Sequence, residues 1–591
     1  MPHEIISLQI GNYANFVGAH FWNLQEAGFS YNSQQPTSRE VDVDVLYREG
    51  ETLRGESTFT PRLVVCDYHG SIHSRRAIAG GLYQDDNEIL DKNGNRIESG
   101  QGENTSWDGT VKVEKQNPEE DAPNHFLREV RESHKRIPVL PNGLTKRRRH
   151  ADYGLEKSVR TWSDFLGVAY HPRSLSTLSN YWINDLPTPF DGYSAGLEEW
   201  RSCLNDSLQQ NSLEESLRHF VEECENMAGF QLLLDGHNGF GGYSSALLDH
   251  LSDEYGHKSA LVYPLFPPAP PQSDDAEGNA RKDCQGLFNY GLFVASTASG
   301  SGNSSTRLHS ACVPLSLMSK LTRPRETLPG LPLAHFRPDS FYHTSAILAG
   351  AIDSFGLVYR LSSPERVHLR DAVDAITPHQ RKVAAMSTML PFPLRQNDSL
   401  FSALKAIDAE YLPVTSLTPH VKTPLIDSQN RCYSQIMSLR GVPRTRWQCS
   451  GEEIRSYRLS HEVASMSANR LFEDFMSSYC PNTYGVGRVT ELPCYTALPF
   501  PQFFSPSISE DGFTVSSGNR IEDVKRLPVM AGLHSTDKVA DLLQELTTTC
   551  SKTTLNKYPR LLQSGSMELD EYKESFERLQ ELAGRYREND F

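Results

Sequence analysis

The sequence predicts an α/β fold in which a parallel, Rossmann-like sheet domain precedes a smaller α+β domain and C-terminal helices. Two observations predict it. The succession of strand, glycine-bearing turn and helix occurs twice in the first half of the chain. The length of 591 residues also exceeds what one hydrophobic core normally serves, so we expect more than one domain.

The first strand, turn and helix lie at the N-terminus. Glu4 to Ile10 is an almost continuous apolar run, typical of a strand buried on both faces of a parallel sheet. Gly11 ends this run, and Ala14 to Gln25 has apolar residues near helical spacing. Another strand is predicted at Arg62 to Cys66, followed by a turn at Asp67-Tyr68-His69-Gly70. Open α/β sheets bind ligands at this carboxyl edge.

The same succession returns after residue 210. Ser212 and Glu215 form a predicted capping box at the start of an amphipathic helix. The apolar run Phe230 to Leu234 predicts the next strand, and Asp235 to Gly242 a glycine-bearing loop. A helix from Ser244 to Tyr255 completes the succession.

The remaining segments set the expected domain boundaries. Residues 85–160 are polar and carry little apolar periodicity, so we expect an elaborated loop. Two segments rich in Pro, Gly and Ser indicate a linker over residues 266–306. The predicted division is therefore a first domain at 1–265, this linker, a second domain at 307–535 and a helical segment at 536–591.

The predicted helical segment ends in an amphipathic helix. A strand is expected within Ile521 to Gly532 and a helix at Asp537 to Thr549. In the last helix, from Met567, five apolar residues fall on one stripe that should be buried. They are Tyr572, Phe576, Leu579, Ala583 and Tyr586.

Composition excludes several classes of protein. The net charge of −16 disfavours nonspecific binding to nucleic acid. The ten cysteines contain no Cys-x-x-Cys pair, which argues against a zinc site or a disulfide framework and for reduced thiols. The N-terminus resembles neither a secretory signal nor a transit peptide, and no apolar run is long enough to span a bilayer. We therefore expect a cytosolic chain.

One basic run, Lys146 to His150, departs from the acidic balance. It reads as a solvated loop, with a nuclear-import signal or a contact to anionic lipid as the alternatives.

Several segments resemble tubulins. Glu4 to Trp22 resembles their first strand, turn and helix, and Phe59 to Asp67 resembles the strand before their acidic loop. Gly229 to Tyr243 is similar to the tubulin Gly-Phe-Gln strand and its Gly-Gly-Gly-Thr-Gly-Ser-Gly signature, without a gap. Met389 to Pro393 resembles Met-Val-Pro-Phe-Pro of the second tubulin domain, and Met567 to Tyr586 the C-terminal helix. The resemblance implies a tubulin-like GTPase fold.

Other segments are more specifically similar to the Misato family of tubulin-like proteins. They are Ala14 to Glu26, Trp162 to Leu166, His171 to Ser174, Val221 to Cys224 and Asp235 to Gly242. The resemblance implies a role in mitochondrial distribution and morphology, at the cytosolic face of the outer mitochondrial membrane or in the cytoplasm. It also implies tubulin, tubulin-folding chaperones or spindle microtubules as partners, and no nucleic acid.

The resemblance points to a nucleotide site for GTP or GDP with magnesium. Its candidate residues are Gly11, Asn12, Tyr13, Asp67, Asn238, Gly239, Gly241 and Gly242. A glycine-bearing turn before a helix binds phosphate through its N–H groups and the positive helix end. Phe240 and Tyr243 replace small residues of the tubulin signature and would crowd a phosphate unless they turn into the core. Two interpretations stay open: a nucleotide-binding loop, or a tight turn kept for packing.

The residues that would hydrolyse a nucleotide differ from the tubulin pattern. Tubulin polymers complete each site with an Asn-x-Asp loop of the neighbour, and the tubulin spacing places Pro378-His379-Gln380-Arg381 there. Asp371 and Asp374 could serve if the alignment slips, although a solvated helix face suits them better. His69 stands where a second carboxylate is expected. We therefore expect no catalytic residues and no enzyme activity. The alternatives are an active GTP-binding and GTP-hydrolysing protein, or a polymer subunit.

Overall fold

The computed structural model describes most of the chain. The described residues are 3–28, 40–51, 57–72, 124–129, 153–183, 189–205, 213–268, 276–299, 308–322, 331–362, 364–409, 414–422, 431–457, 460–481, 483–515, 523–552 and 569–587.

A six-stranded parallel sheet forms the first layer, in the order β5-β4-β1-β6-β7-β8. The strands are β1 (Glu4–Ile10), β4 (Leu63–His69), β5 (Leu175–Trp182), β6 (Met227–Asp235), β7 (Ser259–Leu265) and β8 (His309–Cys312). Ile10 is in register with Cys66 on one side and Leu234 on the other. The three central strands therefore end together, which confirms the predicted single sheet and its shared carboxyl edge.

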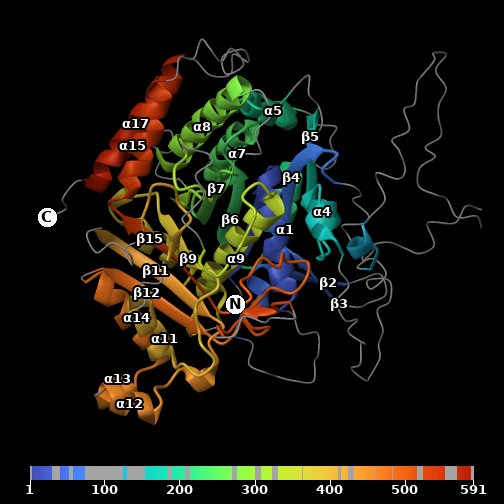
Figure 1. Ribbon diagram of the computed structural model, residues 1–591. Helices are drawn as coiled ribbons and strands as arrows, with labels where there is room; N and C mark the ends of the chain where they lie inside the picture. The colour runs from blue at the N-terminus through green and yellow to red at the C-terminus, as the bar shows by residue number, and fades with distance from the viewer. Residues whose placement is uncertain are drawn as a thin grey trace, which may run out of the picture.

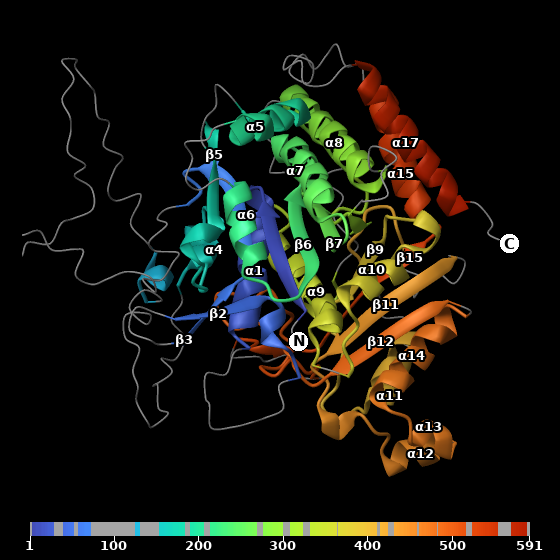
Figure 2. The same cartoon turned by 180° about the vertical axis from the view of Figure 1, so that it is seen from behind.

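Helices cover both faces of this sheet because its strands are apolar on both sides (Figure 2). The covering helices are α1 (Asn12–Glu26), α5 (Tyr193–Asn205), α6 (Leu213–Glu222), α7 (Gly239–Tyr255) and α8 (Ala276–Ser299). On β1, Ile5 joins the core with α1, whereas Ile6 and Leu8 join the core with α7 and α8. Successive residues of one strand thus bury opposite faces.

A second, mixed sheet has the order β10-β9-β15-β11-β12. Its strands are β9 (Ala385–Met389), β10 (Thr415–Ser416), β11 (Cys432–Arg440), β12 (Tyr484–Thr490) and β15 (Val529–Thr536). Helix α9 (Phe341–Arg360) lies between the two sheets, packed on α1, β11 and β15 (Figure 1). Helices α11 (Leu400–Ala409) and α14 (Ala468–Tyr479) share a separate core with the opposite face.

Shorter elements complete the fold. They are β2 (Tyr47–Glu51), β3 (Ser57–Pro61), β13 (Cys494–Tyr495), β14 (Arg526–Leu527), α4 (Leu155–Ser158), α10 (Leu369–Ile376), α12 (Gly451–Tyr457), α13 (His461–Ala464), and the 3-10 helices η1 (Val43–Val45), η2 (Trp162–Phe165), η3 (Pro172–Ser174), η4 (Pro378–Gln380) and η5 (Arg444–Arg446).

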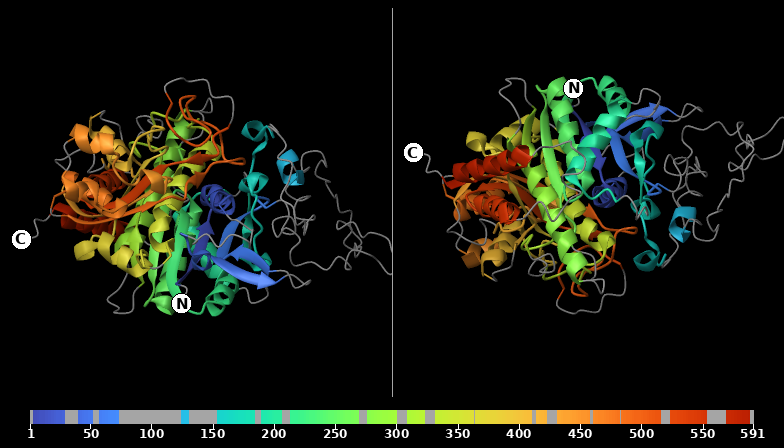
Figure 3. Two further views of the ribbon diagram at one scale, coloured as in Figure 1. Left: turned by 90° about the horizontal axis from the view of Figure 1, so that it is seen from below. Right: turned by 90° about the horizontal axis from the view of Figure 1, so that it is seen from above.

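The last two helices, α15 (Val539–Lys552) and α17 (Leu569–Arg587), pack on each other and on α8. All five residues of the predicted stripe, Tyr572, Phe576, Leu579, Ala583 and Tyr586, are buried there. In both views of Figure 3 these helices lie on the side of the molecule opposite the N-terminal β2–β3 hairpin. Among the described helices, none is long and apolar enough to cross a bilayer.

The structure corrects the predicted linker. Residues 266–306 include α8, whose apolar face packs on α7 and α17, so most of the predicted linker is a core helix. Strand β8 then pairs with β7, which extends the first sheet beyond the predicted boundary at residue 307. The Pro- and Gly-containing flanks had hidden the helical periodicity between them.

Two predicted turns are also corrected. Asp67, Tyr68 and His69 belong to β4, and the chain turns only at Gly70. The second predicted loop ends early because α7 begins at Gly239.

The predicted polar loop lies mostly outside the described residues, as do Ser212 and the basic run Lys146 to His150. Within 85–160, however, Phe126, Leu127 and Leu155 are buried in the main core. These parts of the region belong to the folded domain.

Candidate functional site

The N-terminus of α1 is held by a carboxylate from the same chain. Asp235, the last residue of β6, accepts hydrogen bonds from the Tyr13 N–H (3.0 Å) and the Ala14 N–H (2.9 Å). Gly11 begins this turn with φ of 111°, and a Cβ there would lie 2.5 Å from the Asp235 side chain. The turn therefore requires glycine. A carboxyl group of the same chain thus occupies the two N–H groups that a bound phosphate would use.

Among the residues that the structure describes, no basic side chain forms an ion pair with the buried Asp235. Burial raises the pKa of the Asp235 carboxyl well above its usual range, and the charge of Asp67 raises it further. The two N–H donors act in the opposite direction. The partly positive end of α1 is therefore the main compensation available to this carboxylate.

The N-terminus of α7 is also internally bonded. The Gly239 N–H donates to the carbonyl of Phe190 at 3.1 Å. Asn238 caps the helix, because its side-chain oxygen accepts from the Phe240 N–H (3.0 Å) and its carbonyl from the Gly241 N–H (3.0 Å). Each of these three first-turn donors therefore already has a protein acceptor.

The three glycines of α7 allow close packing. A Cβ on Gly242 would lie 1.8 Å from the carbonyl oxygen of Tyr193 in α5, and one on Gly239 would lie 2.7 Å from the Phe190 ring. A Cβ on Gly241 would lie 2.8 Å from the Gly236 carbonyl oxygen. The geometry fits the packing interpretation of this glycine-rich segment.

The two aromatic residues of the signature turn into the core. Phe240 packs edge-on against Tyr68 and Phe190, with ring centroids 4.9 and 5.1 Å apart. Tyr243 packs against Trp200 at 5.2 Å. Neither Phe240 nor Tyr243 covers Gly239. The ring next to Gly239 is that of Phe190, which precedes α5 in the chain.

Asp67 lies inside the same edge of the sheet. It is fully buried and accepts from the Asn15 amide (3.1 Å), the Trp162 indole (2.7 Å) and the Tyr68 N–H (2.8 Å). Burial raises the pKa of Asp67 to about 6, against the effect of these donors. Asp67 thus joins β4 to α1 and η2. His69, at the end of β4, stacks on Trp182 at 4.9 Å.

Asn12 is the first residue of α1 and is partly exposed, but its Oδ1 atom is buried and has no hydrogen-bond partner among the described residues. Of the sequence-predicted residues, the structure brings Gly11 and Tyr13 to Asp235, and it places Asn238, Gly239, Gly241 and Gly242 at the start of α7.

Three residues that organise this edge were not among the site residues predicted from the sequence. They are Asp235, Phe190 and Asn289. Asn289 of α8 donates to the carbonyls of Asp191 (2.7 Å) and His237 (3.0 Å). Asp235 had a sequence signal, since a lone acid ends an otherwise uncharged buried strand. Phe190 and Asn289 had none, because only the fold brings them here.

Comparison with known proteins agrees with this tubulin-like arrangement. A family model for the Misato segment II tubulin-like domain matches residues 3–132, and a tubulin domain model matches residues 154–361. Protein misato homolog 1 of Danio rerio is 30% identical over 99% of this chain and 97% of its own length. The chain belongs to the Misato family.

Other Misato-family relatives also match along nearly their whole length. Protein misato homolog 1 of Homo sapiens is 31% identical over 99% of this chain and 98% of its own. Protein misato of Drosophila melanogaster is 28% identical over 100% of this chain and 99% of its own.

In this Misato-family chain, the segment aligned with the tubulin Asn-x-Asp loop is only partly exposed, because His379 and Gln380 are exposed and Arg381 is buried. Arg381 is 1% exposed, with its guanidinium 4.0 Å from the Tyr433 ring centroid and its Nε donating to the Arg585 carbonyl (3.0 Å). The Arg381 side chain therefore packs within its own chain, although the tubulin spacing alone places it at a subunit contact. Asp371 and Asp374 lie on the exposed face of α10, as expected of a solvated helix.

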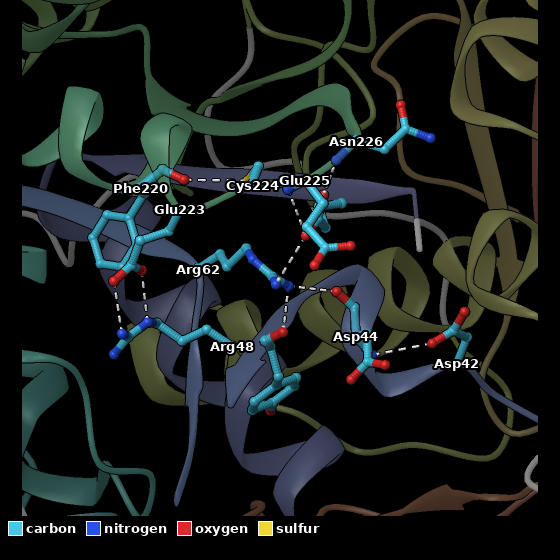
Figure 4. Close-up of polar contacts among 11 residues, drawn as sticks. Asp42, Asp44, Arg48, Arg62, Phe220, Glu223, Cys224, Glu225 and Asn226 are labelled. Carbon is cyan, nitrogen blue, oxygen red and sulfur yellow. Dashed lines mark hydrogen bonds and ion pairs between the residues drawn. The ribbon is translucent and has the colours of Figure 1, made fainter. Parts of the chain in front are cut away.

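The amino edge of the first sheet carries a cluster of ion pairs (Figure 4). Arg62, from the tubulin-like Pro-Arg segment, is buried beside Glu4 at 3.3 Å and also donates to main-chain carbonyls of the Asp44 to Tyr47 segment. Glu4 accepts from the Asn226 N–H at 2.6 Å. These contacts connect β1, β4 and β6 at their amino ends. The tubulin-like Pro-Arg segment therefore stabilises the fold here.

No group of three or more His, Cys, Asp or Glu within the described ranges could hold a metal ion. All ten cysteines are free. The phosphate donors already engaged at α1 and α7 do not fit a nucleotide as they are arranged.

Proposed function

We propose that this chain is a non-polymerising, nucleotide-independent tubulin relative that acts through protein contacts in mitochondrial distribution and morphology. The proposed process, mitochondrial distribution and morphology, is the one that the resemblance to the Misato family implies. The observation that supports nucleotide independence is the Asp235 carboxylate, bound to the two N–H groups at the start of α1.

A nucleotide phosphate would have to displace Asp235 to reach these N–H groups. The phosphate would then add negative charge to a buried edge that already holds the Asp67 side chain. A buried N–H group left without an acceptor costs roughly 1–3 kcal/mol, so the two hydrogen bonds to Asp235 compete with a phosphate for these groups. At α7, a phosphate would likewise have to replace the Phe190 carbonyl and the Asn238 cap.

The proposed site of action is the cytosolic face of the outer mitochondrial membrane and the adjacent cytoplasm, through peripheral contacts. Tubulin and its folding chaperones are the proposed partners. The net charge of −16 supports protein rather than nucleic-acid contacts.

The first test asks whether purified protein carries or turns over a nucleotide. We expect extraction followed by chromatography to release no stoichiometric GTP or GDP, and GTP turnover with magnesium to stay near background at every protein concentration. Stoichiometric nucleotide, or turnover per molecule that rises with protein concentration, would promote the GTPase alternative. Arg381→Asp is unsuitable for this test because it would replace a buried guanidinium, which donates to the Arg585 carbonyl, with a buried carboxylate that cannot donate.

The second test asks whether nucleotide binding matters in cells. Asn12→Asp adds an anion beside the position of a phosphate, while an acid in the first turn of α1 suits the helix dipole. Asn12→Ala is the matched control. After depletion of the endogenous protein, both variants should restore the mitochondrial network as wild type does. Failure of Asn12→Asp alone would indicate nucleotide dependence. A normal network after depletion would refute the proposed process itself.

A further inference from the structure

A small cavity opens between α11 and the segment that follows β9. It has a volume of about 180 Å³ and is lined mainly by apolar residues, among them Leu333, Leu390, Pro391 and Ala406. Pockets for drug-sized molecules are larger, at about 300–1,000 Å³, whereas an apolar cavity of about 150 Å³ holds one benzene molecule. The cavity therefore has the size and lining for one apolar or aromatic side chain of a partner.

Positive charge lies beside this cavity. Arg395 belongs to the lining and is exposed, and its carbonyl accepts a hydrogen bond from Arg446 Nη1 (3.1 Å), which brings a second guanidinium group close to it. Asp398 is the one acidic residue of the lining. Burial lowers the pKa of Arg446, and the charge of Asp398 opposes this effect. The two arginines therefore exceed the single carboxylate.

Two more cations lie on the adjoining helices. Lys405 of α11 is exposed, with Nζ 4.1 Å from the ring centroid of Tyr457 in α12, and Arg455 of α12 is also exposed. Neither cation forms an ion pair with a carboxylate in the part of the chain that the structure describes. The N–H of Ser399, which directly follows the cavity lining, donates to Glu453 of α12 (3.4 Å). Helix α12 therefore adjoins the cavity.

We propose that this surface binds an acidic segment of a partner protein. One apolar or aromatic side chain of the segment fills the cavity, and its carboxylates face Arg395 and Lys405. The proposal rests on the proposed function, action through protein contacts, and adds the chemistry of the partner.

Charge complementarity supports this choice of partner. The four cations described above outnumber the two carboxylates, whereas the chain as a whole has a net charge of −16. In Figures 1 and 2, α11 and α12 lie at the end of the molecule opposite α5 and α8. An anionic membrane fits less well, because lipid headgroups would contact the cations but leave the apolar cavity unfilled.

The first test uses the purified full chain and fluorescently labelled pentapeptides. Anisotropy should show saturable binding of acetyl-Glu-Glu-Phe-Glu-Glu-amide that weakens as salt screens the charges. Replacing the Phe of the peptide by Ala should lower the affinity at least about 10-fold, because the cavity then stays unfilled. Lys-Lys-Phe-Lys-Lys should bind more weakly still. Equal binding of the Phe and Ala peptides, or no saturable binding of either, would overturn the proposal.

The second test changes the protein. Ala406→Phe fills the cavity and should reduce the affinity for the Phe peptide to that for the Ala peptide. Gln448→Phe adds the same ring at an exposed position outside the lining and is the matched control. Lys405→Glu should weaken binding about 5-fold, whereas Lys573→Glu, an equal charge change on α17, should not. Melting temperatures show whether each variant is folded. Wild-type affinity in folded Ala406→Phe and Lys405→Glu would contradict the proposed surface.

Two further outcomes separate this proposal from its alternatives. Sedimentation with phosphatidylcholine–phosphatidylserine vesicles that depends on Lys405, without peptide binding, would assign the surface to a membrane and overturn the proposal. A normal mitochondrial network after depletion would refute the proposed process, but peptide binding by the purified chain would still support an acidic partner. The two proposals can therefore fail independently.

Discussion

Buried carboxylates are stabilised in two different ways in two regions of this molecule. At the carboxyl edge of the first sheet, Asp67 and Asp235 accept hydrogen bonds only from neutral groups in the contacts described above, and burial raises the pKa of both. Between the sheets, Asp353 of α9 forms ion pairs with Arg360 (2.7 Å) and Arg440 (2.5 Å). Burial alone would raise the pKa of Asp353, but the two guanidinium groups lower it below its usual value.

The difference gives the two regions opposite responses to pH. Because the folded pKa of Asp353 is lowered, its contribution to stability is present above the unfolded pKa and is lost as pH falls through the folded value. Because the folded pKa of Asp67 is raised, the folded state holds its proton to higher pH, and stability declines as pH rises toward 6. At neutral pH the ion pairs of Asp353 therefore stabilise the folded state, whereas ionisation of the buried Asp67 destabilises it.

The largest effect is expected at the centre. Asp353→Ala should lower the free energy of unfolding by about 3–5 kcal/mol, because it leaves Arg360 and Arg440 buried without their shared anion. Urea unfolding at neutral pH measures this loss. Asp371→Ala, on an exposed helix face, is the control and should change little. A loss below about 1 kcal/mol for Asp353→Ala would mean that water or a rearranged acceptor replaces the carboxylate.

The second-largest effect is a change of stability with pH that depends on Asp67 at the carboxyl edge of the first sheet. The pKa of Asp67 is about 6 in the fold against an ordinary 3.8, which corresponds to about 3 kcal/mol. Asp67→Asn carries no charge, so its stability relative to wild type should rise by about that amount from pH 4 to pH 7. Chemical unfolding at both pH values provides the measurement. Parallel curves for wild type and variant across this range would refute the raised pKa.

Substitution of Asp235 should cause a smaller loss of stability, which added phosphate should partly restore. Asp235→Ala leaves the Tyr13 and Ala14 N–H groups without their acceptor, at a cost of about 1–3 kcal/mol. The opened helix terminus should then accept an external anion, so inorganic phosphate should raise the melting temperature of the variant more than that of wild type. Sodium chloride at equal ionic strength is the control. Equal responses would show that Asp235 does not exclude anions from this site.

The smallest effect concerns one neutral donor. Asn15→Ala removes the amide hydrogen bond to Asp67 and should cost about 1 kcal/mol. The pKa of Asp67 should rise further, because a donor that stabilises the charged form is lost. Unfolding free energies measured from pH 4 to pH 8 separate the two effects. An unchanged pH profile would indicate that the Asn15 amide contributes nothing to this pKa.

Local sequence pattern by itself determined the elements with strong periodicity. The apolar runs of Glu4 to Ile10 and Phe230 to Leu234 predicted β1 and β6, because strands buried on both faces need such runs. The stripe from Tyr572 to Tyr586 predicted the buried face of α17, since residues three or four apart share one side of a helix. Segment motifs alone also sufficed to identify the Misato resemblance.

Only the tertiary structure decided what the glycine-rich segments do. Whether the N–H groups of Tyr13 and Gly239 are free for phosphate depends on Asp235 and on the Phe190 carbonyl, which lie far from them in sequence or act through the backbone. Likewise, the fold buries Arg381 against the last helix, where spacing alone had placed it at a subunit contact. Hydrogen-bond partners and burial are non-local properties, so no local pattern encodes them.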